Sequence, residues 1–133
     1  MLQNIDDYMK MDNSLTLDEM REIHAAMLNE IGSDPDSLDL YHDLCKAAVR
    51  YANMRARCNT MSLDEKSAED HNRTGSHNAL IDQFNMLARW IRKQGSPAAW
   101  RDALGYVDED PTLRRRIGDM GCYLAFVAAL LER

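Results

Sequence analysis

The stretch that decides the fold is SHNALIDQFNMLARWIRKQ, residues 76–94. Its apolar side chains cover an arc of roughly 220° on a helical wheel of 3.6 residues per turn. They are Leu80, Ile81, Phe84, Met86, Leu87, Ala88, Trp90 and Ile91. A helix that is apolar over so wide an arc needs neighbours on more than one side. We therefore expect residues 76–94 to form the central helix of an all-α bundle.

Start and stop residues mark further helices on both sides of this segment. A side-chain cap or a proline in the first turn favours a helix start, and glycine favours a helix end. The signals are a capping box at Thr16 and Glu19, a stop at Gly32, a start at Asp34-Pro35 for a helix to roughly Asn59, and starts at Ser96-Pro97 and Asp110-Pro111. Residues 1–133 thus read as a single domain of four to five helices, with residues 1–14 as an N-terminal segment.

The segment 62–76 admits two interpretations. Ser62 and Glu65 form a second capping box, but the residues from Asp64 to Asn78 are almost wholly polar. Such a segment cannot bury enough apolar surface to hold itself in place. It is either a solvated extension of the central helix or a mobile loop, and Gly75 makes a break there plausible.

The predicted C-terminal helix has an apolar surface that favours contact with a second protein chain. Its apolar seam lies beside a stripe of small residues where another backbone can approach closely, and residues 123–131 are apolar on all sides. The stripe consists of Gly118, Cys122, Ala125 and Ala129. A helix end that is apolar all round must be covered by the bundle or by a second subunit. We therefore expect a homo-oligomer, a homodimer in the simplest case, joined through this helix.

Composition narrows the class of protein. The net charge of −6 disfavours nucleic acid and anionic lipid as partners. Three cysteines without a CxxC pair read as reduced thiols in a cytoplasmic protein. The longest uncharged run, Met120 to Leu131, is shorter than the ~20 residues that a membrane span requires. We expect no membrane association and no cofactor.

Polar residues on faces that should be apolar are the first candidates for a site. His24, Arg55 and His77 each fall on the core side of a predicted helix. They are either hydrogen-bonded core groups or members of a ligand site, because helical bundles often place sites in their cores. A buried Arg55 needs a counter-charge, and Asp82 is a reasonable candidate for it.

A polar stripe on the central helix is the second candidate. Asn78, Asp82, Asn85 and Arg89 follow one another at i, i+4, i+7 and i+11. The stripe is either a narrow strip facing solvent or the polar wall of a cleft. In the second case Arg89 would bind a small anionic ligand and Asp82 would hold the guanidinium in place.

Two short segments match only parts of the motifs of metal-dependent enzymes. Glu19-x-x-Glu22 resembles the first half of the motif of all-helical nucleotide pyrophosphohydrolases, but the second half is only approximated by Asp36-x-x-Asp39. The dipeptide His42-Asp43 is similar to part of the pattern of metal-dependent phosphohydrolases. In both cases these side chains fall on the polar side of a predicted helix. We expect no metal site and retain a Mg²⁺- or Mn²⁺-dependent nucleotide phosphohydrolase as an alternative.

The segment from Ser76 to Arg89, with Trp100-Arg101 further along, resembles a small family of uncharacterised bacterial helical proteins. The family has no assigned activity, so the resemblance implies a helix and no function. It coincides with the polar stripe. Together, these observations favour a non-enzymatic helical binding protein that self-associates, with the phosphohydrolase and the small-anion binder as alternatives.

Overall fold

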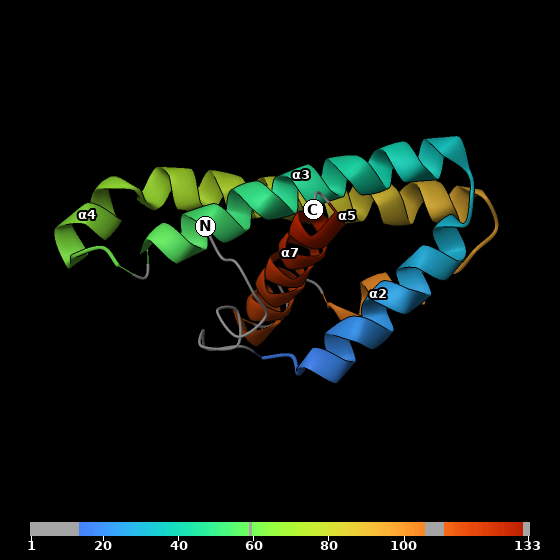
Figure 1. Cartoon of the computed structure of the whole chain (residues 1–133), viewed down its shortest axis with the longest axis horizontal. Helices are drawn as coiled ribbons and strands as arrows, with labels where there is room; N and C mark the ends of the chain where they lie inside the picture. The colour runs from blue at the N-terminus through green and yellow to red at the C-terminus, as the bar shows by residue number, and fades with distance from the viewer. Residues whose placement is uncertain (1–13, 59, 106–110, 132–133) are drawn as a thin grey trace.

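The computed structural model describes residues 14–58, 60–105 and 111–131, and these ranges form an all-α bundle without strands (Figure 1). The helices are α2 (Leu17–Ile31), α3 (Pro35–Cys58), α4 (Leu63–Ala68), α5 (Asp70–Lys93), α6 (Ala99–Ala103) and α7 (Pro111–Leu131). The predicted fold class is confirmed. The described ranges hold six helices, not four to five, because the polar segment contributes one of its own.

Two long antiparallel helices form the body of the molecule. Each of α3 and α5 has 24 residues, which corresponds to a length of about 36 Å. They lie side by side, and α7 crosses them, while α2 and α6 pack together at the end where α5 finishes (Figure 1). The predicted central helix α5 touches α3, α4, α6 and α7, and α3 shares this central role because it packs along both α5 and α7.

Local capping explains where several helices begin. Thr16 and Glu19 form a complete capping box at α2, and α2 ends before Gly32 with its positive φ of 55°. At α3 the carboxylate of Asp34 accepts a hydrogen bond from the backbone N–H of Ser37 at 3.0 Å. Each side chain satisfies a backbone N–H that has no partner inside the helix.

The polar segment 62–76 is helical. Ser62 and Glu65 complete the second capping box, which starts α4. The first turns of α5, Gly75 included, then form the solvated extension that the sequence left open as one of two possibilities. Arg57 of α3 pairs with Glu69 across the turn at 3.7 Å.

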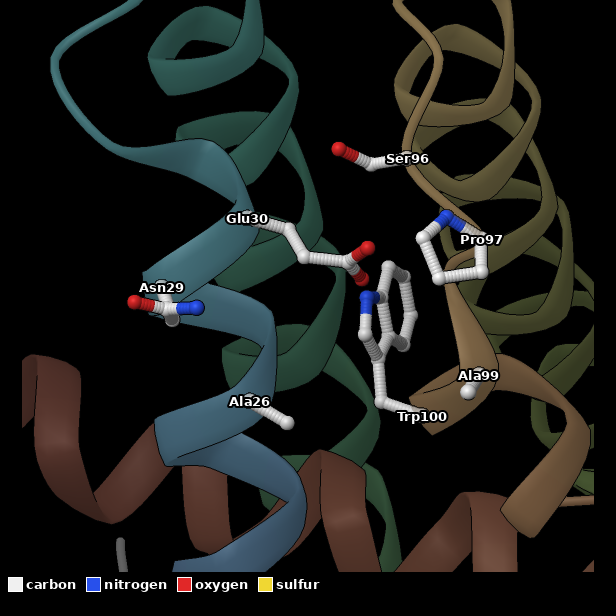
Figure 2. A pocket seen from close by; sticks show the side chains of 7 residues that line it. All are labelled: Ala26, Asn29, Glu30, Ser96, Pro97, Ala99 and Trp100. Atoms are coloured by element: carbon white, nitrogen blue, oxygen red, sulfur yellow. The ribbon is translucent and has the colours of Figure 1, made fainter.

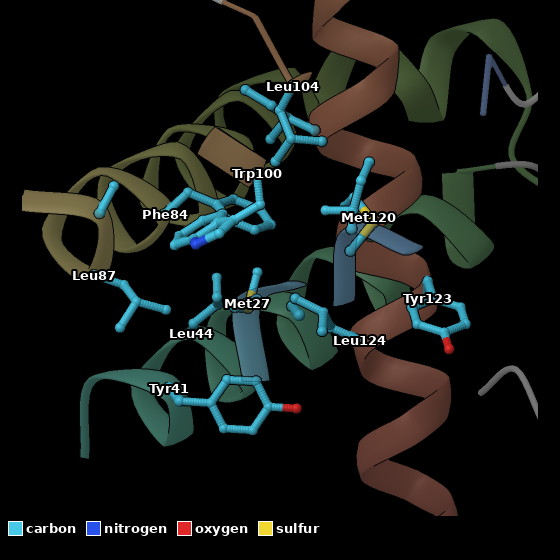
Figure 3. Close-up of a cluster of buried hydrophobic side chains, with 14 of the residues drawn as sticks. Met27, Tyr41, Leu44, Phe84, Leu87, Trp100, Leu104, Met120, Tyr123 and Leu124 are labelled. Carbon is cyan, nitrogen blue, oxygen red and sulfur yellow. The ribbon is translucent and has the colours of Figure 1, made fainter. Parts of the chain in front are cut away.

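The hydrophobic core lies where α2, α3, α5, α6 and α7 meet (Figure 3). Its fully buried members include Met27, Leu44, Phe84, Leu87, Leu104, Met120 and Leu124. They come from four helices and from Leu104, the residue that ends α6, so no single pair of helices can form the core alone. Met86 is 40% exposed, which shows that the wide apolar arc of α5 is not covered completely.

Two glycines let α7 approach its neighbours closely. A Cβ atom at Gly118 would lie 2.6 Å from the hydroxyl oxygen of Tyr51, and one at Gly121 would lie 2.5 Å from a methyl carbon of Leu80. Further along the predicted small-residue stripe, Cys122 and Ala125 pack against Ala52 of α3. Over these residues the close approach occurs within one chain.

Within the described residues, no helix combines the length and the apolar character needed to cross a bilayer.

Candidate functional site

The most deeply buried charge in the described residues is a carboxylate on α7. The side chain of Asp119 is fully buried, and its Oδ1 accepts a hydrogen bond from Nη1 of Arg55 at 3.3 Å. Arg55 therefore pairs with Asp119 across α3 and α7, and not with Asp82, which is exposed on α5. The side chain of Arg55 is 18% exposed, so the pair lies at the edge of the core.

The second oxygen of Asp119 anchors the residues before α2. Its Oδ2 accepts hydrogen bonds from the backbone N–H of Ser14 at 2.6 Å, from the Ser14 hydroxyl at 2.9 Å and from the backbone N–H of Leu15 at 3.0 Å. With Arg55 on the other oxygen, the carboxylate receives four donors. A buried charge is tolerated when it is paired and hydrogen-bonded in this way, which identifies Asp119 as a structural anchor.

An aromatic and a thiol complete this cluster. The ring of Tyr51 lies 5.5 Å from the ring of His77, and Nη1 of Arg55 lies 3.7 Å from the sulfur of Cys122. Burial raises the pKa of Cys122 to about 11, although Arg55 acts in the opposite direction. A thiol with so high a pKa is a poor nucleophile near neutral pH.

His24 lies in a different group of contacts. Its Nε2 and the hydroxyl of Tyr41 share a hydrogen bond of 2.8 Å, and its ring meets the edge of the Tyr123 ring. Burial lowers the pKa of His24 and raises that of Tyr41 well above its ordinary value. The contact partners of His24 are aromatic core residues. Tyr51 interacts with both His77 and Arg55, so the described contacts join Arg55 and His77 but leave His24 apart.

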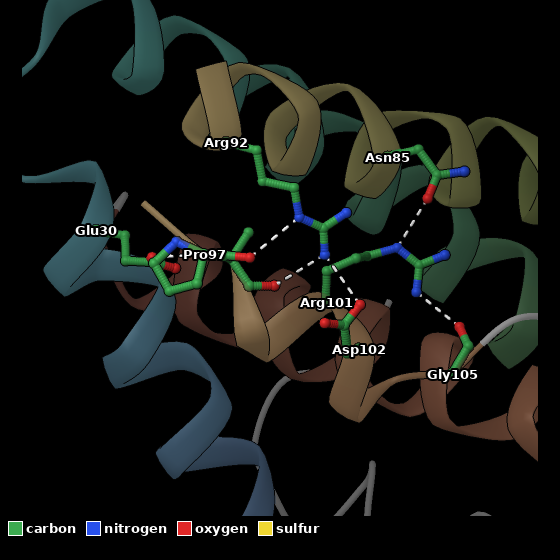
Figure 4. A network of polar contacts seen from close by, with 8 residues as sticks. Glu30, Asn85, Arg92, Pro97, Arg101, Asp102 and Gly105 are labelled. Carbon is green, nitrogen blue, oxygen red and sulfur yellow. Dashed lines mark hydrogen bonds and ion pairs between the residues drawn. The ribbon is translucent and has the colours of Figure 1, made fainter. Parts of the chain in front are cut away.

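The polar stripe on α5 faces outward over most of its length. Asn78, Asp82 and Arg89 are exposed, and Asn85 is half-buried. Oδ1 of Asn85 accepts a hydrogen bond from Nε of Arg101 at 2.8 Å (Figure 4). The stripe therefore reaches the interior at one position only.

Arg101 is a buried cation that sequence reasoning missed. The residue is 3% exposed, and besides Asn85 it donates from Nη1 to the carbonyl of Gly105 at 2.7 Å. The neighbouring Arg92 holds the start of α6, because its guanidinium donates to the carbonyls of Pro97 and Ala98 (Figure 4). The segment 99–103 combines apolar and charged residues over little more than one turn, which gave no signal that its arginine would be buried.

A pocket of about 480 Å³ lies between α2 and α6 (Figure 2). It is lined by Ala26, Asn29, Glu30, Ser96, Pro97, Ala99 and Trp100. Oε2 of Glu30 accepts a hydrogen bond from the backbone N–H of Ala98 at 3.1 Å. The buried Nε1 of Trp100 has no hydrogen-bond partner among the described residues. None of these residues was a candidate site residue from the sequence, where they read as ordinary helix and turn residues.

The carboxylates considered for metal binding do not form a site. Glu19, Glu22, Asp39 and Asp43 are all exposed, and Glu19 is occupied as a partner in the α2 capping box. In the described ranges no three His, Cys, Asp or Glu side chains lie together as a metal site requires.

Comparison with protein-family models, with curated proteins and with solved structures gave no match to this chain. The resemblance of residues 76–89 to a family of uncharacterised bacterial proteins therefore stays a prediction. The described residues offer a structural ion pair, an open pocket between α2 and α6, and an apolar helix end.

Proposed function

We propose that this chain is a non-enzymatic helical binding protein that associates with a second copy of itself through the C-terminal end of α7. The observation that carries the proposal is the exposure of two leucines on a folded helix. Leu130 is 50% exposed and Leu131 is 79% exposed. They are the last two residues of an uncharged run of twelve that starts at Met120. The exposed end of α7 is therefore continuous with its buried apolar part, which includes Met120 and Leu124.

The charge of the chain supports a second copy as the occupant. Two chains of net charge −6 repel one another over most of their surfaces. The end of α7 carries no charge between Met120 and Leu131, so two copies can meet there without removing charged groups from water. In a two-fold symmetric contact each exposed leucine meets the same surface of its partner, which doubles the apolar area that one chain offers.

The size of the exposed end points to a weak dimer. A stable interface buries about 1,200 Å² or more in total. The N-terminal part of the small-residue stripe, at Gly118 and Cys122, already packs against other helices of the same chain. The surface left for a partner is the last two turns of α7, where residues 126–129 are half-buried and the two leucines are exposed. We therefore expect association in the micromolar range or weaker.

Sedimentation velocity over a series of concentrations tests the proposal. The wild-type chain should shift from monomer to dimer as its concentration rises. The variant Leu131→Glu should remain monomeric, because a carboxylate placed in an apolar contact must be desolvated. A wild-type chain that stays monomeric at every concentration, with its fold intact by circular dichroism, would contradict the proposal.

Leu63→Glu is the matched control. Leu63 is 82% exposed on α4, so this variant introduces the same charge at an equally exposed leucine away from α7. It should dimerise like the wild-type chain. Equal loss of dimer in both variants would show that net charge, and not the end of α7, governs association.

The alternatives have less support. The small-anion binder depends on Arg89, which is exposed, and on Arg55, whose charge is compensated by Asp119. A thermal-shift screen in which no anion raises the melting temperature would count against it. The phosphohydrolase has no described group of carboxylates to hold its metal. The three free thiols support a reducing compartment, and we propose the cytoplasm.

A further inference from the structure

The pocket between α2 and α6 contains a hydrogen-bond donor without an acceptor. Trp100 is 3% exposed, and its Nε1 is buried and unpartnered within the described part of the chain. The other tryptophan shows the ordinary arrangement, since Nε1 of Trp90 donates to Oδ2 of Asp34 at 3.2 Å and to Oγ of Ser37 at 3.0 Å. A buried donor left without a partner destabilises the fold, so Trp100 invites an acceptor from outside the chain.

An acceptor faces this donor across the pocket. Figure 2 shows the carboxylate of Glu30 and the nitrogen-bearing edge of Trp100 turned toward each other. Oε2 of Glu30 is used by the backbone N–H of Ala98, and no hydrogen bond to Oε1 occurs within the described residues. The pocket therefore combines an unused acceptor oxygen on Glu30 with the buried, unpartnered donor of Trp100, which the Glu30 carboxylate faces.

The surroundings of Glu30 favour a ligand that donates a hydrogen bond to its carboxylate. Glu30 lies in the last turn of α2, where the backbone carbonyls place partial negative charge, and that turn contains no basic residue. The nearby guanidinium of Arg92 is bound to Pro97, Ala98 and Asp102. No cation among the described residues pairs with this carboxylate, so an N–H group of a ligand could serve as its partner.

The walls of the pocket suit a small, partly apolar molecule. Ala26, Pro97 and Ala99 offer hydrocarbon surface, and the volume of about 480 Å³ falls within the range of small-molecule sites. A ligand would reach the edge of the indole only if the Glu30 carboxylate, which now faces that edge, turned aside. A flat molecule could then lie between α2 and α6 with one edge on both polar groups.

We propose that this pocket binds a small cyclic amide or imide, whose N–H donates to Glu30 while the adjacent C=O accepts from Nε1 of Trp100. This edge supplies a donor and an acceptor side by side, in the order that the two side chains require. The site is independent of the self-association proposed above, because its lining residues belong to α2, α6 and the turn between α5 and α6.

Nuclear magnetic resonance of the indole N–H groups tests this site in the intact chain. The two tryptophans give two signals, and uracil serves as the probe with an imide edge. Uracil at millimolar concentration should shift the Trp100 signal in a saturable way and leave the Trp90 signal in place. The matched probe 1,3-dimethyluracil lacks both N–H groups and should bind about tenfold more weakly or worse, the effect of losing one hydrogen bond to a charged group.

Two protein variants complete the experiment. Glu30→Ala should weaken uracil binding to a similar degree, while Asp36→Ala, an exposed carboxylate on α3, should leave it unchanged. The proposal is overturned if the Trp100 signal does not move, if both probes move it equally, or if Trp90 moves with it. It is also overturned if Glu30→Ala alone shifts the Trp100 N–H as the loss of an existing hydrogen bond does.

Discussion

Asp119 of α7 holds Arg55 of α3 with one carboxylate oxygen and the backbone of residues 14 and 15 with the other. The two helices cross at this point, and the start of α2 is fixed to the same group. This contact therefore sets the position of three parts of the chain at once. Removing the Asp119 carboxylate should therefore lower the stability of the whole bundle.

Replacing the anchor with alanine should destabilise the fold strongly. Asp119→Ala removes the carboxylate that accepts from Arg55, from the Ser14 hydroxyl and from two backbone N–H groups. Loss of one partner from a buried pair costs ~3–5 kcal/mol, and because Arg55 is 18% exposed we expect about 2–4 kcal/mol. Urea denaturation measures the change. The control Asp102→Ala removes the exposed pair with Arg92 and should cost about 1 kcal/mol or less; similar losses in the two variants would contradict the structural role of Asp119.

The close approach of α7 to α5 predicts opposite effects for one substitution at two glycines. Gly121→Ala drives a Cβ into Leu80 and should destabilise the protein by about 1–3 kcal/mol, as overpacking does. Gly75→Ala meets open space inside α5 and should stabilise it by up to about 1 kcal/mol, since alanine is the better helix former. Thermal unfolding measures both. The same sign at the two positions would show that packing does not decide the outcome.

The buried His24 predicts a loss of stability in mild acid. Burial lowers its pKa in the folded state, so the folded chain binds this proton less readily than the unfolded chain does. The contribution to stability is complete above the unfolded pKa of about 6.5 and falls as the pH drops toward the lower folded value. Urea unfolding at pH 7.5 and 5.5 should show a decrease that His24→Gln reduces. His71→Gln, on the exposed face of α5, should retain the full decrease.

The thiol of Cys122 should resist alkylation in the native protein. With a pKa of about 11, only about one thiol in a thousand is ionised at pH 8. Burial at 2% exposure adds a steric barrier. Iodoacetamide labelling followed by peptide mass spectrometry should show Cys122 modified far more slowly in the folded chain than in urea. Comparable alkylation rates in the folded chain and in urea would show that α7 separates readily from the C-terminal end of α3.

Local signals were sufficient to predict where several of the helices begin and end. Thr16 with Glu19 and Ser62 with Glu65 lie three residues apart, and each pair caps its helix whatever the rest of the chain does. The helical state of residues 62–76 could not be decided in this way. A polar sequence reveals neither the pairing of Arg57 with Glu69 nor its continuity with the long helix α5.

The contacts of the buried polar groups depend on residues far apart in the chain. Arg55 was expected to need a counter-charge, but its partner lies 64 residues away, and nothing in the local pattern separates Asp119 from the other acidic residues of the chain. Arg101 is held by Asn85 and Gly105 through the turn of α6. The pocket at Trp100 arises from two segments about 70 residues apart, so it existed only once the helices were placed.

The anchor at Asp119 also has a consequence for how the chain acquires its structure during synthesis. The donors at Ser14 leave the ribosome 105 residues before their acceptor. At about 5–20 residues per second, that interval is roughly 5 to 20 s. During this time the backbone ahead of α2 has no final partner, although the helix itself can already form from its own capping box. Completion of the native state is therefore set by the emergence of α7, and a nascent chain halted before residue 119 would hold α2 as an unanchored helix.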